Sequence, residues 1–178
     1  MKRAVIILCI LILLFVGAYL LYNQFGSQPE LQISGSRDLD EGFLDFQAED
    51  QAGNAVYFSD FLDRPTIAFF WTTWCSFCKL GIDELVDLYE ELGDEMQILL
   101  VNLSQMMGNR ELILGREFME ASDFPFVSIY DIEGEAERLY AVTGVPMILF
   151  FDADGAIYHR QLGYMSADAM LQVMADLE

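Results

Sequence analysis

Two cysteines separated by two residues are the part of the sequence best suited to chemistry. Cys75 and Cys78 enclose Ser76-Phe77 and stand where a buried strand is expected to turn into a helix. At a helix N-terminus, unpaired N–H groups and the positive end of the helix dipole stabilise a thiolate at Cys75. Cys78 lies three residues further, on the same helix face and within disulfide reach. The spacing therefore predicts thiol–disulfide exchange, in which Cys75 attacks a partner's disulfide and Cys78 then displaces the product.

A zinc site and a purely structural disulfide are the alternatives for this pair. A structural zinc ion takes four ligands, and after the N-terminal apolar run the chain offers only Cys75, Cys78 and His159 as nitrogen or sulfur donors. A purely structural disulfide across only two residues is also disfavoured. We therefore expect no metal and no other cofactor.

The pattern of apolar residues indicates which elements position the dithiol. Continuous apolar runs predict two strands buried on both faces, and helical spacing predicts an amphipathic helix directly after the first of them. Two paired segments around Gly-containing turns predict hairpins. Strands alternating with helices indicate an α/β three-layer domain with a mixed central sheet. The expected strands are 43–46, 56–58, 66–71, 98–103, 126–130, 147–151 and 156–160, and the expected helices are 75–92, 110–121, 133–141 and one capped by Ser166 that runs to Leu177.

The N-terminus is typical of a membrane anchor. Residues 4–22 are 19 uncharged, mostly apolar residues, just enough to cross about 30 Å of hydrocarbon as a helix. Lys2 and Arg3 precede this run, and the next basic residue is Arg37, so the positive-inside rule predicts that the rest is exported. A cleaved signal peptide ending near residues 16–18 is the alternative. Either outcome places the dithiol outside the cytoplasm, where disulfide chemistry is possible.

Composition divides the remaining chain into a linker and one domain. Residues 1–22 are assigned to the anchor; residues 23–41 are rich in Gln, Ser, Gly and Asp and predict a flexible linker, and 42–178 form the folded domain. The chain has 29 acidic and 9 basic residues, a net charge of −20, and without Lys2 and Arg3 the charge is −22. Such an acidic body repels phosphate backbones, which excludes nucleic acid as a partner. The charge indicates either a solvated surface or steering of basic partners.

The residues around the dithiol resemble those of thioredoxin-like proteins. Residues 70–79, Phe-Trp-Thr-Thr-Trp-Cys-Ser-Phe-Cys-Lys, are similar to the family's active-site segment, and residues 144–155 are similar to its cis-proline loop and the hairpin that follows. The anchor, the leading hairpin and the extra helical sequence between the two motifs resemble the membrane-anchored ResA/TlpA branch. The resemblance implies a thioredoxin-like three-layer fold with an N-terminal β-hairpin and a central helical insertion, preceded by one transmembrane helix.

The resemblance also implies an activity and a site. Members of this branch are extracytoplasmic thiol-disulfide oxidoreductases, and several serve cytochrome c maturation by reducing apocytochrome cysteines. By resemblance, Cys75 and Cys78 are catalytic, the Val145–Pro146 bond is cis, and Trp74, Val145 and Pro146 bind substrate. The implied partners are exported proteins with disulfides or thiols and a membrane thiol electron donor.

Three positions depart from the family pattern near the dithiol. The buried acid six residues before the first cysteine is Phe69, the Glu three residues after the second is Gly81, and the proline five residues after it is Asp83. The usual proton acceptor for Cys78 is therefore missing. Asp83 and Glu84 are the candidates to replace it, and a charged helix surface is the alternative role for both.

Other functions remain open beside disulfide reduction. A disulfide oxidase or isomerase uses the same dithiol, but no basic residue stands between the cysteines to stabilise the thiolate of a powerful oxidant. A thiol peroxidase would use Thr72, three residues before Cys75, although the proline that precedes this Thr in peroxiredoxins is absent. A non-catalytic thioredoxin-fold binding module is the alternative of another class.

Overall fold

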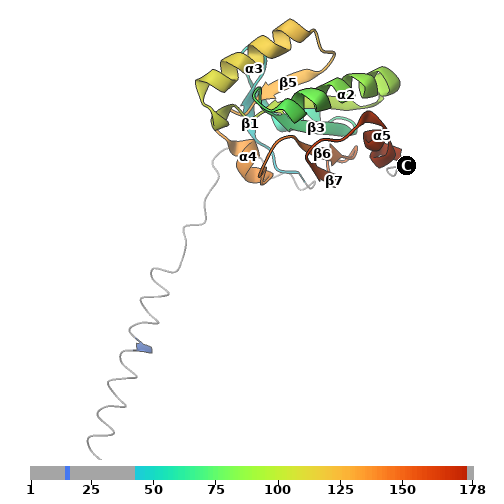
Figure 1. Ribbon diagram of the computed structural model, residues 1–178. Coiled ribbons are helices and arrows are strands. Elements are labelled where there is room, and N and C mark those ends of the chain that lie inside the picture. The colour runs from blue at the N-terminus through green and yellow to red at the C-terminus, as the bar shows by residue number, and fades with distance from the viewer. Residues whose placement is uncertain (1–14, 17–42, 176–178) are drawn as a thin grey trace, which may run out of the picture. The chain divides into compact units, whose positions relative to one another are not determined.

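The computed structural model of the protein describes residues 15–16 and 43–175 (Figure 1). Residues 15–16 are helical, and the rest of the expected anchor and linker lies outside the described residues. Among the described residues, no helix is long and apolar enough to cross a membrane. Residues 43–175 lie within one compact unit, and this unit carries the dithiol.

Seven strands of this unit form one mixed sheet. Their bounds are β1 Gln47–Glu49, β2 Ala55–Tyr57, β3 Thr66–Trp71, β4 Gln97–Asn102, β5 Val127–Tyr130, β6 Met147–Phe151 and β7 Ile157–Leu162. The strand order is β2-β1-β5-β4-β3-β6-β7. β3, β4 and β5 run parallel, whereas β6 and β7 at one side and β1 and β2 at the other pair antiparallel. The expected mixed sheet is confirmed.

Helices connect the strands and cover the sheet (Figure 1). Within residues 43–175 the α-helices are α2 Ser76–Leu92, α3 Asn109–Ser122, α4 Glu135–Leu139 and α5 Ala167–Ala175. Short 3-10 helices lie at Phe58–Phe61, Gly93–Glu95 and Ser104–Met106. α2 joins the parallel strands β3 and β4, and α3 joins β4 and β5, as parallel pairing requires a crossover.

Both faces of the sheet are buried, which gives the domain three layers. On β3, Ala68 and Phe70 belong to one apolar core, whereas Ile67, Phe69 and Trp71 belong to the other. All five are fully buried, because a strand between two helical layers has no solvent side. The core with Ile67, Phe69 and Trp71 also contains the helix residues Ile82, Leu85, Leu88, Met119 and Met170. The core with Ala68 and Phe70 also contains Phe46, Phe58, Ala136 and Tyr140.

The first strand of the leading hairpin forms later in the chain than expected, whereas its turn lies where it was expected. The strand expected at 43–46 is wrong, because β1 begins after it and pairs with β2. Phe46 is instead fully buried and stacks on Phe58, with 4.9 Å between ring centroids. The carboxylate of Asp45, also buried, accepts hydrogen bonds from the backbone N–H and the hydroxyl of Ser59, both at 2.9 Å. Phe43 and Phe46, which suggested a strand, therefore pack into the core, whereas Leu44 is exposed.

The elements nearest the dithiol match the expectation closely. β3 has the expected bounds. α2 begins one residue later than expected because Cys75 keeps extended backbone angles, φ −84° and ψ 108°, and serves as the N-cap. α4 is shorter than the expected helix 133–141, since Gly134 before it adopts the left-handed conformation at φ 69°.

Gly81 allows α2 to lie close to β3. A Cβ atom at this position would lie 2.8 Å from Cζ and 3.0 Å from Cε2 of Phe69. The Phe69 ring is fully buried and has little room to move. The two departures from the family pattern are therefore coupled, because the ring at position 69 occupies the space that a side chain at position 81 would need.

We expect Gly81→Ala to lower the free energy of unfolding by about 1–3 kcal/mol, because the added methyl group overpacks this contact. In an unhindered helix the same change stabilises by about 1 kcal/mol. Denaturant unfolding measures the difference. In the Phe69→Leu background the substitution should become neutral or stabilising, and a stabilising effect in the wild-type protein would contradict this close approach.

Asp131 generates a second prediction, concerning pH. Its fully buried carboxylate accepts hydrogen bonds from the backbone N–H groups of Glu135 at 2.8 Å and Glu137 at 3.2 Å. Burial raises the pKa of Asp131 to about 6, although these backbone bonds oppose the shift. A raised pKa favours the protonated form in the folded state, so this residue contributes less stability as pH rises from 4 to 7.

We therefore expect Asp131→Asn, which keeps an acceptor oxygen and does not titrate, to gain stability relative to the wild type across this pH range. The relative gain should reach about 2–3 kcal/mol between pH 4 and pH 7. Urea unfolding at several pH values measures it. A difference between the two proteins that does not vary with pH would show that the carboxylate titrates normally.

Candidate active site

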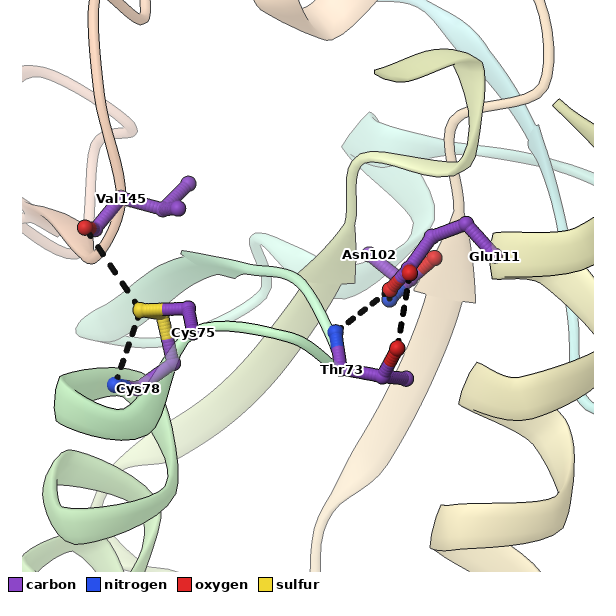
Figure 2. The surroundings of a disulfide bond; sticks show 6 residues. All are labelled: Thr73, Cys75, Cys78, Asn102, Glu111 and Val145. Carbon is purple, nitrogen blue, oxygen red and sulfur yellow. Dashed lines mark hydrogen bonds between the residues drawn. A yellow bond between two sulfur atoms is a disulfide. The ribbon is translucent and has the colours of Figure 1, made fainter. Parts of the chain in front are cut away.

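The two cysteines form a disulfide at the start of α2 (Figure 2). Their Cα atoms are 5.2 Å apart, within the range that disulfides require. The backbone N–H of Cys78 donates a hydrogen bond to Sγ of Cys75 at 3.1 Å. Cys78 is fully buried, whereas Cys75 retains 7% exposure. The predicted disulfide reach is confirmed, and more of Cys75 than of Cys78 reaches the surface.

The Val145–Pro146 loop faces the disulfide from the neighbouring strand. The bond between these residues is cis, and the carbonyl oxygen of Val145 lies 3.6 Å from Sγ of Cys75 (Figure 2). The sheet explains this approach, because β6 follows the loop directly and lies beside β3 with Met147 opposite Phe70. When the disulfide is reduced, the Cys75 thiol has a proton that it can donate to this carbonyl.

Three apolar residues close to Cys75 in the sequence are exposed. Trp74 is 55% exposed, Phe77 is 63% exposed and Leu80 is 53% exposed. All three lie within five residues of Cys75 along the loop and the first turns of α2. Trp71 differs from them, because it is fully buried and packs on the ring of Phe118 with 5.2 Å between centroids. Trp74, Phe77 and Leu80 are therefore open to solvent on the segment that carries the dithiol.

Within residues 43–175, neither candidate proton acceptor on α2 forms a hydrogen bond with Cys75 or Cys78. Asp83 is exposed. The carboxylate of Glu84 accepts hydrogen bonds from the hydroxyl of Tyr164 and, at 2.8 Å, from the backbone N–H of Ala167 at the start of α5. The Tyr164 hydroxyl, followed by the Ala167 N–H, lowers the pKa of Glu84. Glu84 therefore anchors α5 to α2, and a lowered pKa makes it a weaker base.

Sequence reasoning missed a buried acid near the dithiol. Glu111 lies in the first turn of α3 and is fully buried. Its carboxylate accepts hydrogen bonds from the backbone N–H of Thr73 at 2.5 Å, the Thr73 hydroxyl at 2.8 Å and the side-chain amide of Asn102 at 3.0 Å (Figure 2). Its position in an amphipathic helix gave no signal, because the contact joins residues 38 positions apart.

His159, the third candidate zinc ligand, lies on β7. Its ring packs edge-on against Phe150 with 5.4 Å between centroids. In the part of the chain that the structure describes, no three His, Cys, Asp or Glu side chains are grouped so that they could hold a metal ion.

Similarity to known proteins agrees with this geometry. The model of the AhpC/TSA family matches residues 40–160, which is more than half of the chain. Sporulation thiol-disulfide oxidoreductase A of Bacillus subtilis is 26% identical over 108 residues, which cover 60% of this chain and 64% of that protein. The chain therefore spans slightly less than two thirds of this relative.

Two further proteins extend the comparison. Thiol-disulfide oxidoreductase ResA of Oceanobacillus iheyensis is 28% identical over 138 residues, which cover 75% of this chain and 69% of that protein. The crystal structure of the exposed lipoprotein thioredoxin of Streptococcus pneumoniae superposes with a TM-score of 0.64 at 25% identity, over 75% of this chain and 99% of that one. The thioredoxin-like fold is thus confirmed. The chain belongs to the AhpC/TSA family and is similar to thiol-disulfide oxidoreductases of the ResA kind.

Proposed function

We propose that the protein is an extracytoplasmic thiol-disulfide oxidoreductase that reduces disulfides in exported proteins, with apocytochrome c among the substrates. The observation that carries the proposal is the Cys75–Cys78 disulfide at the N-terminus of α2, opposite the Val145 carbonyl. Family membership and the names of the relatives support exchange chemistry at this disulfide.

The two cysteines have different roles in the proposed reaction. In the reduced protein, the Cys75 thiolate attacks one sulfur of a substrate disulfide, and the other substrate sulfur leaves as a thiolate that takes up a proton. Cys78 then loses its proton and attacks Sγ of Cys75, which releases the second substrate thiol and forms the Cys75–Cys78 disulfide. Two electrons pass from the protein to the substrate. A membrane thiol donor restores the dithiol by the same exchange in reverse.

The surroundings of Cys75 favour reduction over oxidation. A strong oxidant of this fold owes its potential to a reduced form with a well-stabilised thiolate. Ser76 and Phe77 between the cysteines carry no charge. The helix N-terminus and the Cys78 N–H stabilise the thiolate without help from a charged residue between the cysteines, and we infer a low reduction potential.

The surface beside Cys75 suits an extended apolar substrate segment. The Val145 carbonyl is positioned to accept a backbone hydrogen bond from such a segment, in the manner of an added strand. Trp74 and Phe77 supply exposed aromatic area next to the sulfur. We assign substrate binding to Trp74, Val145 and Pro146, as the family pattern implies.

The proposed location follows from the N-terminal sequence. We propose that residues 1–22 anchor the chain in the cell membrane as a single helix, that residues 23–41 form a linker, and that the domain 42–178 works on the extracytoplasmic side. One solved structure of similar fold belongs to an exposed lipoprotein, which supports a location at the cell surface.

We expect Cys78→Ser to accumulate mixed disulfides with exported proteins in cells, because the attacking sulfur is kept and the resolving one is lost. Cys75→Ser is the matched control, since it keeps a buried thiol in place of the accessible one, and it should trap few partners. Non-reducing electrophoresis followed by mass spectrometry measures both. Equal trapping by the two variants, or trapping by Cys75→Ser alone, would reverse the assigned roles.

The same variants separate reductase from peroxidase and binding activity. A peroxidase would convert Cys75 of the Cys78→Ser variant rapidly to a sulfenic acid with hydrogen peroxide and would trap no protein partner. A binding module would retain its partners in the Cys75→Ser, Cys78→Ser double variant. We expect slow reaction with peroxide and loss of partners in the double variant.

The acidic body allows a further prediction about substrate charge. If the −22 charge beyond the anchor steers basic substrates, the second-order rate with a basic substrate should fall steeply as ionic strength rises past about 0.1 M. A neutral substrate carrying the same disulfide should show no such fall. Stopped-flow measurement of both rates tests this expectation, and an identical response of the two substrates to salt would assign the charge to surface solvation alone.

A further inference from the structure

We propose that Glu111 is a positioning residue for the dithiol, which holds the loop between β3 and α2 in the conformation that presents Cys75. Its two carboxylate oxygens accept the backbone N–H and the hydroxyl of Thr73, at 2.5 and 2.8 Å. Thr73 is two residues before Cys75, so the bonds fix the chain immediately before the reactive sulfur (Figure 2).

The burial of Glu111 indicates that these bonds matter. A carboxylate taken out of water is costly unless hydrogen bonds compensate it. Glu111 is fully buried and accepts three bonds, from Thr73 twice and from Asn102 once. None of the ion pairs found within residues 43–175 includes Glu111. Neutral donors, two of them on the active-site loop, therefore satisfy this carboxylate, and such bonds to a charged acceptor are stronger than those between neutral groups.

Asn102, the other hydrogen-bond partner of Glu111, is itself held firmly in place. Asn102 ends β4 opposite Trp71 of β3 and is fully buried. Its side-chain oxygen accepts a hydrogen bond from the Ser104 hydroxyl at 2.8 Å, which fixes the amide group that Glu111 uses. A Cβ atom on Gly115 would lie 3.1 Å from the Asn102 amide nitrogen, so α3 packs tightly against the strand end. Glu111 thus ties the loop to two elements at once.

The loop must be held for Cys75 to act. The Thr72 carbonyl accepts the backbone N–H of Cys75 at 3.3 Å, and Sγ of Cys75 lies between the Cys78 N–H at 3.1 Å and the Val145 carbonyl at 3.6 Å. A loop released at Thr73 would let Cys75 move relative to both groups. The hydrogen bonds of Glu111 go to Thr73 and Asn102 and not to either sulfur, so Glu111 acts through Thr73.

Two substitutions at position 111 isolate the hydrogen bonds from the charge. Glu111→Gln keeps an oxygen that accepts the Thr73 N–H, and Glu111→Ala keeps none, while both lack the carboxylate charge. The measurement is the rate at which iodoacetamide alkylates Cys75 in the reduced protein at pH 7, which needs no substrate. An unchanged alkylation rate would therefore count against the role of Glu111 without counting against the proposed function.

We expect Glu111→Ala to slow alkylation about threefold or more relative to Glu111→Gln, and to slow reduction of a protein disulfide about tenfold or more. Glu49→Gln is the matched control. Glu49 lies on β1 and forms an ion pair at 2.7 Å with Arg116, which lies on α3 like Glu111, so the substitution removes a contact of α3 that does not involve the active-site loop. It should lower the melting temperature without changing either rate.

Thr73→Val keeps the test decisive if Glu111→Ala does not fold. It removes only the hydroxyl bond to Glu111 and should slow both reactions by a smaller factor in the same direction. Equal rates for Glu111→Ala and Glu111→Gln would overturn the proposal. An equal slowing by Glu49→Gln would also overturn it. If Glu111→Ala does not fold, wild-type rates for Thr73→Val would overturn it.

Discussion

The site depends on one local interaction, the capping of α2 by the side chain of Cys75. The sulfur accepts the N–H of Cys78 at 3.1 Å, so the reactive atom is also the group that satisfies the first turn of the helix. This places a thiolate where the helix dipole stabilises it and brings Cys78 beneath it in the core. Disulfide chemistry and helix initiation therefore use the same atoms, and a change that displaces the start of α2 displaces the chemistry.

Four elements of the fold meet at this cap. β3 ends just before the active-site loop, α2 lies tightly on β3 because Gly81 leaves room for the ring of Phe69, and β6 begins at Met147, directly after Pro146. α3 adds Glu111, whose contact with Thr73 joins the helix between β4 and β5 to the active-site loop. β3 and β4 run parallel, so their C-terminal ends lie together, and β6 runs antiparallel to β3, so the loop that precedes β6 lies at the same end of the strands.

Much of the fold around the site follows from the sequence, because the strongest signals are local. The run 66–71 is apolar throughout and forms β3 with those bounds, since a strand buried on both faces needs no polar side. The strand expected at 43–46 failed because apolar residues indicate burial, and burial there is met by stacking on Phe58. Glu111 gave no signal, because its partners become neighbours only when α3 folds onto the end of β4. Long-range contacts of this kind, like the coupling of Phe69 with Gly81, depend on packing that periodicity does not encode.

We propose that this dithiol is a reductant, because no charged residue between the cysteines adds to the stabilisation that the helix N-terminus and the Cys78 N–H give the Cys75 thiolate. The most direct test is the reduction potential of the Cys75–Cys78 pair, measured by equilibration of the protein in a thiol–disulfide redox buffer. We predict a value at or below about −270 mV, the potential of thioredoxin. A value near about −120 mV, that of a strong disulfide oxidant, would contradict it.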